Sequence, residues 1–149
     1  MTATTWPDSP QAFAEATWSD ILPYYDDLAN RPLDARNVEH WLRDWTMLED
    51  LVGEAASLAS VAYTCDTSDP AKERAHVRFS SEIGPKLAEQ RVRLAGRLLD
   101  LGYERPHLTT SLRRFRNAQE LFREENLPLT AELQRTNIRY QKITGAMLV

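Results

Sequence analysis

The sequence predicts an all-α protein, an antiparallel bundle of about five helices with long, kinked members and coiled-coil-like packing. Three observations predict this fold class. Apolar residues recur at three- and four-residue spacing, which is the period of one face of an α-helix. No stretch keeps the apolar/polar alternation that is typical of a strand. The interruptions are short turns, and short connections make neighbouring helices antiparallel.

Two regions are expected in the chain. Residues 1–16 are expected to form a loose leader, because prolines and small polar residues interrupt any helical pattern there. Residues 17–149 predict a single helical domain, whose length suits one hydrophobic core.

The first helix is expected to begin between Thr17 and Asp20 and to end at Asn30. Pro23 fits this helix only in its first turn. A later proline would lose a backbone hydrogen bond and contact the preceding turn.

The second helix has the clearest pattern in the sequence. Asp34 is expected to be its N-cap, and Leu33 and Val38 occupy the two positions of a hydrophobic staple. Trp41 and Trp45 could form the floor of a ligand pocket, but their spacing favours a place in the core. They belong to a seam with strict 3-4 spacing along one helix face, formed by Val38, Trp41, Trp45, Leu48, Val52, Ala55, Ala59 and Ala62.

A third long helix is expected after the turn that ends at Asp69, which suits an N-cap followed by Pro70 at the first helical position. It should run to about Leu101 and kink at Gly84 and Pro85, because proline removes one backbone hydrogen bond. Its apolar face contains Val77, Leu87, Leu94, Leu98 and Leu101.

Two further helices are expected. Thr109 or Thr110 caps the fourth, and a break at Asn126 to Pro128 precedes the fifth. The side chains expected to point inward are Leu112, Phe115, Leu121 and Phe122 in the fourth helix, and Leu129, Leu133, Tyr140, Ile143 and Met147 in the fifth. Residues 145–149 are mostly apolar, which suggests that more protein follows or that this end docks on a partner.

Composition excludes several classes of protein. The apolar fraction of 42% argues against a disordered chain. No apolar run approaches the ~20 residues that span a bilayer, and the first residues do not resemble a secretory signal. Cys65 is the only cysteine, so an intrachain disulfide is impossible and a cytoplasmic location is expected.

Charge is distributed unevenly along the chain. Residues 1–66 contain 12 acidic and 3 basic residues, whereas residues 67–149 contain 10 acidic and 15 basic residues. A basic half could contact nucleic acid, as could the arginines around Phe115 in the run 113–116. We favour acidic helices packed beside basic ones, with Phe115 inward and its neighbouring arginines in solvent or paired with Glu120. No nucleic-acid partner and no membrane partner is expected.

The residues that could support chemistry are few. His40, His76 and His107 are the only histidines, and none begins a His-Glu-x-x-His pattern, so no zinc site or other cofactor is expected in this chain. Asp44 follows His40 by one helical turn and could share a metal, but a surface role is favoured. Cys65 is interpreted as a small buried residue rather than a nucleophile.

Several segments resemble one family of enzymes. Residues 121–129 (LFREENLPL) and 140–147 (YQKITGAM) look like a signature of oligoendopeptidase F-like members of the thimet-oligopeptidase-like zinc metallopeptidases. Residues 63–69 and 17–24 are similar to the end of a long helix and to the opening of the first helix in that family. The likeness extends in order over about residues 17–149.

The resemblance implies the N-terminal helical lobe of such a peptidase, a wall of its substrate channel. The full enzyme would cleave short peptides in the cytoplasm with zinc held by His-Glu-x-x-His and a further Glu, and no position here matches those ligands. The remaining motif positions have no assigned role: Arg116, Asn117, Phe122, Arg123, Glu124, Glu125, Asn126 and Tyr140.

Two functional hypotheses follow. In the first, the chain is the channel-forming lobe, inactive alone, and its partner is the catalytic remainder of the peptidase, which supplies the zinc and the peptide substrate. In the second, the chain is a stand-alone helical interaction module that self-associates as a homo-oligomer, or binds a partner, through apolar helix faces.

Overall fold

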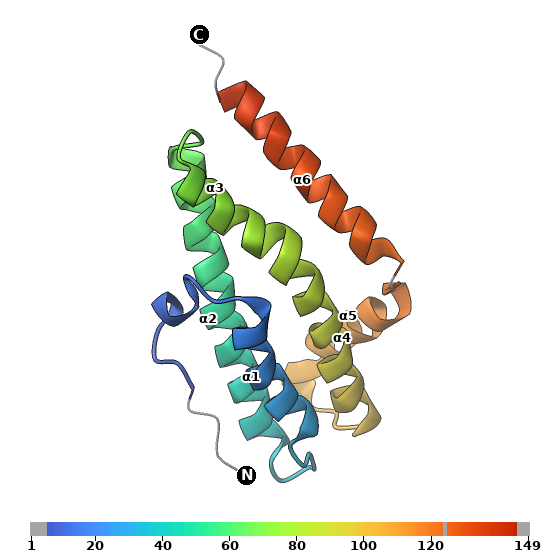
Figure 1. Cartoon of the computed structure of the whole chain (residues 1–149). Coiled ribbons are helices and arrows are strands. Elements are labelled where there is room, and N and C mark those ends of the chain that lie inside the picture. The colour runs from blue at the N-terminus through green and yellow to red at the C-terminus, as the bar shows by residue number, and fades with distance from the viewer. Residues whose placement is uncertain (1–5, 124, 146–149) are drawn as a thin grey trace.

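The computed structural model describes residues 6–123 and 125–145. The described residues form helices and connecting turns, with no strand among them, which confirms the all-α fold class (Figure 1). In chain order the elements are η1 (Pro10–Phe13), α1 (Trp18–Asn30), α2 (Val38–Cys65), α3 (Pro70–Val77), η2 (Arg78–Ile83), α4 (Gly84–Asp100), η3 (Pro106–Leu108), α5 (Thr109–Leu121) and α6 (Asn126–Gly145). Because α3, η2 and α4 are continuous, the described residues form five main helical segments, as predicted.

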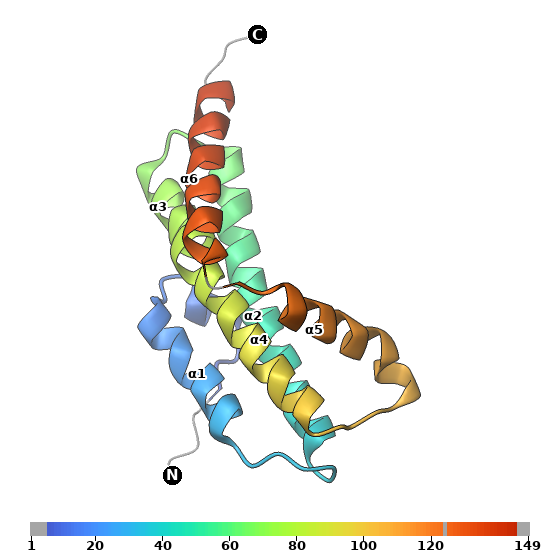
Figure 2. The same cartoon turned by 90° about the vertical axis from the view of Figure 1, so that its right-hand side faces the viewer.

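The helices are arranged around α2. Figures 1 and 2 show α1 and the α3–η2–α4 segment packed beside α2, α5 crossing α4, and α6 running back beside the α3–η2–α4 segment, with its main contacts to η2 and α4. The largest fully buried side chains come from four of these elements: Ile21, Tyr25 and Leu28 of α1, Val38, Trp41, Leu48, Val52 and Tyr63 of α2, Ile83 of η2, and Leu94 and Leu98 of α4.

The start of the domain differs from the prediction in two respects. The expected loose leader is wrong for its last residues, because Phe13 of η1 is buried and packs its ring edge against Tyr24 at 5.7 Å between centroids. Helix α1 begins after Thr17, as expected, and the Thr17 backbone N–H donates to the Asp20 carboxylate at 2.8 Å. Pro23, however, lies beyond the first turn of α1.

Helix α2 buries the predicted seam. Six of its eight members, from Val38 to Ala55, are buried, and Ala59 and Ala62 are partly buried. The N-cap is Asn37 rather than Asp34. Asp34 lies in the preceding turn, where its carboxylate accepts the backbone N–H of Arg36 at 2.8 Å and that of Asn37 at 3.2 Å. The Asp34 carboxylate therefore accepts backbone N–H groups as the sequence suggests, but it does so in the turn before α2 and not at the first residue of the helix.

The expected kink in the third helix takes the form of a π-helix. Asp69 caps α3 as predicted, accepting the Ala71 backbone N–H at 2.8 Å. At the end of η2 the N–H of Gly84 donates to the carbonyl of Phe79, five residues earlier. In a regular α-helix the ring of Pro85 would contact the carbonyl of Ser81. The wider π-turn accommodates this proline at the point where the sequence predicted a distortion.

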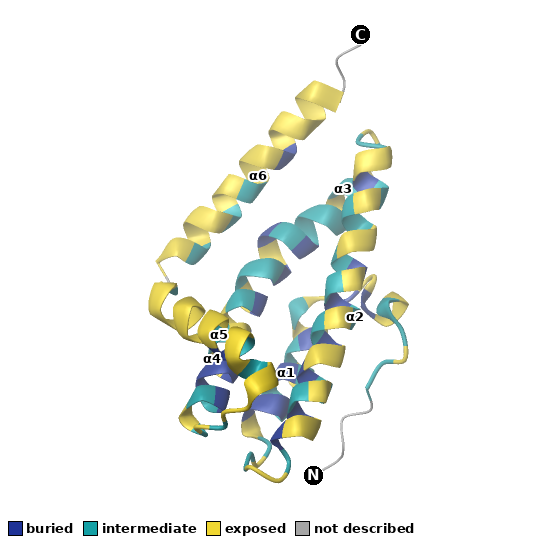
Figure 3. Cartoon of the chain, turned by 180° about the vertical axis from the view of Figure 1, so that it is seen from behind, coloured by how far each residue is buried: buried dark blue, intermediate teal, exposed yellow. Residues whose placement is uncertain are grey.

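The inward side of α6 is opposite to the one predicted. Leu129, Leu133, Tyr140 and Ile143 are exposed by 60–67%, whereas Ile138 is buried (Figure 3). Met147 lies outside the described residues. In α5, Leu112 is buried as predicted but Leu121 is exposed. The spacing predicted an apolar face correctly, but it did not indicate what that face would contact.

Two further expectations concern exposure and membranes. Cys65 is exposed at the end of α2, so its interpretation as a buried residue was wrong. Within residues 6–123 and 125–145, no helix is long and apolar enough to cross a membrane.

Candidate functional site

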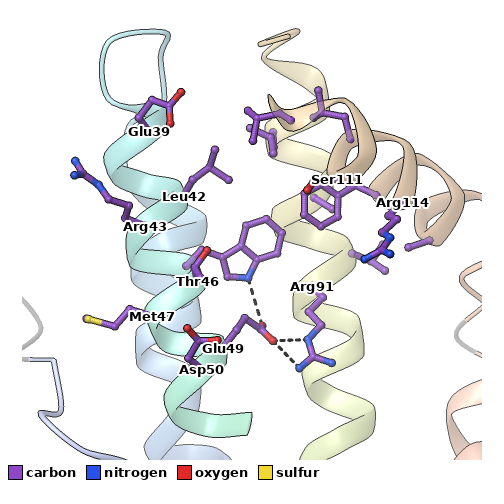
Figure 4. Close-up of a pocket in the computed structure, with 18 of the residues that line it drawn as sticks. Glu39, Leu42, Arg43, Thr46, Met47, Glu49, Asp50, Arg91, Ser111 and Arg114 are labelled. Carbon is purple, nitrogen blue, oxygen red and sulfur yellow. Dashed lines mark hydrogen bonds and ion pairs between the residues drawn. The ribbon is translucent and has the colours of Figure 1, made fainter. Parts of the chain in front are cut away.

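A groove of about 1170 Å³ lies between α2, α4 and α5 (Figure 4). Its floor is apolar and includes Leu42 and Leu51 of α2, Ala95 and Leu98 of α4, and Leu112 of α5. A large concave surface with a few polar groups is the usual form of a ligand or peptide site. The groove is therefore the strongest candidate site in the described part of the chain.

Two aromatic rings join the walls of the groove. Trp45 of α2 stacks on Phe115 of α5, with ring centroids 5.2 Å apart and an interplanar angle of 22°. Trp45 also lies 5.4 Å from Trp41, which is buried beneath it. Both side chains belong to the buried core, as favoured from their spacing, and Trp45 also lines the groove. The stack holds α5 against α2 and so sets the width of the groove.

Glu49 is the polar centre of the groove. Its Oε1 accepts the Tyr25 hydroxyl at 2.9 Å and Trp45 Nε1 at 3.3 Å. Its Oε2 lies 2.6 Å from both Nε and Nη2 of Arg91, a two-point contact that joins α2 to α4 (Figure 4). Burial beside this carboxylate raises the pKa of Tyr25, so Tyr25 remains a neutral donor. Because both oxygens are satisfied, Glu49 is suited to positioning Arg91 rather than to proton transfer.

Charges of both signs line the groove. Glu39, Asp50 and Glu54 lie along α2, whereas Arg91 lies on α4 and Arg114 on α5. Arg43 of α2 also lines the groove, so an extended ligand would meet both carboxylates and a guanidinium group on the α2 side and guanidinium groups on the α4 and α5 sides.

The histidines of the described residues lie apart from one another and have few possible metal ligands around them. No group of three potential metal-binding side chains occurs within residues 6–123 and 125–145. Asp44 lies 3.7 Å from His40 Nε2, but the same carboxylate is paired with Arg31. His107 Nε2 lies 3.6 Å from Glu39 and is mostly exposed. Two-residue contacts of this kind fall short of the three or four protein ligands of a zinc site.

The motif positions from the family resemblance do not line the groove. Arg116 pairs with Glu104 at 2.8 Å, not with Glu120. Arg123 donates to the carbonyls of Glu120 and Phe122, both at 2.8 Å, and so closes the end of α5. The remaining positions lie on the α5–α6 connection or on exposed helix faces: Asn117, Phe122, Glu125, Asn126 and Tyr140. Glu124 lies outside the described residues.

The surroundings of Phe115 match the favoured prediction in part, since Arg116 pairs with Glu104 instead of Glu120. Phe115 points inward against Trp45, while Arg113 and Arg114 are exposed. Sequence reasoning did not identify Glu49 and Arg91 as partners. The i,i+4 spacing of Trp45 and Glu49 indicated that these two side chains could meet on one face of α2. Arg91, however, lies 42 residues further along the chain than Glu49, and only the tertiary packing brings the two together.

One family model matches the chain, that of the Peptidase M3 N-terminal domain, over residues 10–104. The chain belongs to this family. The match spans more than half of the sequence and confirms the predicted N-terminal lobe of an M3-like peptidase. A search of curated proteins and a search of solved structures each found no match.

The matched region contains the elements from η1 to α4. Two walls of the groove, α2 and α4, therefore belong to the M3 N-terminal domain, and the third wall, α5, follows it. The family explains the helical body but assigns no role to the groove.

Proposed function

We propose that the chain is the N-terminal lobe of an oligoendopeptidase-like zinc metallopeptidase and forms part of the wall of its peptide channel. The family match over residues 10–104 is the observation that carries this proposal. In this proposal the catalytic remainder of the enzyme supplies the zinc, and the whole enzyme hydrolyses short peptides in the cytoplasm. The lone cysteine favours such a reducing compartment.

The groove is the part of the lobe best suited to contact a peptide. Its apolar floor suits side chains of a short peptide, and the carboxylates and guanidinium groups around it suit free amino and carboxyl termini. We propose that Arg114 contacts the peptide carboxylate, because it lines the groove and its side chain has no ion-pair partner among the described residues.

The first test is hydrolysis. The purified chain, supplied with zinc, is incubated with an internally quenched short peptide, and we expect no turnover because the sequence contains no His-Glu-x-x-His. Zinc-dependent turnover that persists after repeated purification would contradict an inactive lobe. Sequencing the gene past the Val149 codon tests the other half of the proposal. We expect a downstream frame that encodes His-Glu-x-x-His, and its absence there and in neighbouring genes would refute a peptidase lobe.

The second test separates the groove from the rest of the surface. Binding of a fluorescent peptide with free termini is measured by anisotropy for Arg114→Ala and for the matched control Arg113→Ala. Arg113 is the adjacent exposed arginine and does not line the groove. We expect the first variant to weaken binding about two- to fivefold, the range for an exposed charge pair, and the control to leave it unchanged. Equal losses would place peptide binding outside the groove.

A second candidate function has its own observation. The exposed apolar residues of α6 are typical of a helical interaction module. Such a module would associate through this helix whether or not a catalytic part is present.

A further inference from the structure

Helix α6 has two contrasting faces. One packs on the bundle, with Ile138 buried, its carbonyl accepting the Tyr63 hydroxyl at 3.4 Å, and Lys142 paired with Glu73 at 2.8 Å. At roughly 100° per residue, the opposite face carries a single line of side chains. This line, here called the α6 stripe, consists of Leu129, Leu133, Thr136, Tyr140 and Ile143, all exposed. Figure 3 shows the exposed side of α6 along its whole length.

The α6 stripe has the spacing of a coiled-coil seam. Its members are separated by four, three, four and three residues, which is the a/d pattern of two packed helices. From Leu129 to Ile143 it is roughly 21 Å long, at about 1.5 Å per residue. A lone helix on a protein surface does not need four large apolar residues in this arrangement, so the pattern indicates a helical partner.

The edges of the α6 stripe identify the partner. Glu132 and Arg139 lie along one edge, and Thr130 and Asn137 lie along the other. All four are exposed, and neither charged side chain forms an ion pair within residues 6–123 and 125–145. Glu132 and Arg139 are seven positions apart on one edge. If an identical helix runs in the opposite direction alongside, its Arg139 lies beside Glu132 and its Glu132 beside Arg139, so the charges are complementary.

We propose that α6 is a dimerisation helix, which pairs in antiparallel orientation with α6 of a second copy of this chain about a twofold axis. In this pairing Leu129 packs against Tyr140 of the partner subunit, and Leu133 against Thr136 of the partner subunit. Glu132 then lies opposite Arg139 of the partner subunit, and the symmetry repeats each contact.

The geometry favours this arrangement over a parallel one. In a parallel pair the edges would place Glu132 beside Asn137 of the partner subunit, so that the charges would remain unpaired. The packed face of α6 lies opposite the stripe, so the two bundles would lie on opposite sides of the helix pair. One helix pair is a small interface, and we therefore expect a weak dimer with a Kd on the order of 10 µM.

Sedimentation velocity of the full 149-residue chain from about 1 µM to about 200 µM tests the proposal, because this range spans the expected Kd. We expect a monomer at the lowest concentration and a dimer at the highest. Leu133→Glu should weaken dimerisation at least tenfold, whereas Gln141→Glu should not, because it adds the same charge outside the stripe. Circular dichroism verifies that both variants are folded.

Charge exchange tests the orientation and the partner. Glu132→Arg alone and Arg139→Glu alone should each weaken the dimer, because each places like charges opposite one another. The double variant E132R/R139E should restore it. A chain that remains monomeric at the highest concentration overturns the proposal. Binding of the stripe to anionic phosphatidylglycerol vesicles, or to the catalytic part of a peptidase, would not rescue the proposal in that case. A dimer insensitive to Leu133→Glu, or a double variant no better than the singles, also overturns it.

Discussion

Helices α2 and α6 carry the same kind of apolar pattern but use it in opposite ways. Both have apolar residues at 3-4 spacing, yet the α2 seam is buried, whereas the α6 stripe is exposed. The α2 seam has helices α1 and α3 and elements η1 and η2 around it, while α6 packs on η2 and α4. The pattern therefore predicts that a face will be covered, and the tertiary structure decides whether the same chain covers it.

The largest expected effect concerns the α2 seam. Trp41→Ala should lower the free energy of unfolding by about 3–5 kcal/mol, since it leaves a cavity in the core and removes the donor to the Leu28 carbonyl. Urea unfolding followed by circular dichroism measures the change. A loss below about 1 kcal/mol would mean that α2 is not the centre of the bundle.

A smaller and more local effect is expected where α6 meets the bundle. Ile138→Ala should cost about 2–3 kcal/mol, because Ile138 is the only residue of α6 found buried in the described part of the chain. Hydrogen exchange should accelerate in α6 while α2 remains protected. Exchange that accelerates equally in both helices would show that α6 is an integral part of the α2 core rather than a separately docked helix.

The contact between the end of α2 and α3 should weaken in mild acid. His76 stacks on Tyr63 at 4.9 Å between ring centroids, and burial lowers the pKa of His76. Because the folded chain resists protonation, the unfolded chain binds the proton first and stability falls as the pH drops below about 6.5. The difference in unfolding free energy between about pH 7.5 and about pH 5.5 should shrink in His76→Phe. An unchanged difference would remove His76 from this pH dependence.

The smallest expected effect is on the α6 stripe itself. Leu133→Ala, measured at about 1 µM where the chain is monomeric, should change the free energy of unfolding by less than about 0.5 kcal/mol, as for other exposed positions. Thermal or urea unfolding provides the measurement. A loss comparable to that of Trp41→Ala would mean that the stripe is already covered within the monomer and would remove the contrast with α2.

Parts of the candidate site could be predicted from the sequence. The 3-4 spacing placed Trp45 on the seam, and the interpretation of Phe115 as inward was correct. The Glu49–Arg91 contact and the groove depend on residues from α2, α4 and α5 that are distant in sequence. Local spacing does not encode such contacts, because they depend on how whole helices pack.

The sequence by itself determined the helices, most of their boundaries, the distortion at Pro85 and the family over residues 10–104. These features depend on backbone hydrogen bonding and on periodicity within a few turns, which neighbouring residues specify. Only the tertiary structure decided that Cys65 and the α6 stripe would be exposed and that Asn37 would precede α2. Burial depends on which surfaces meet after the helices have formed, and several helix faces compete for the same core.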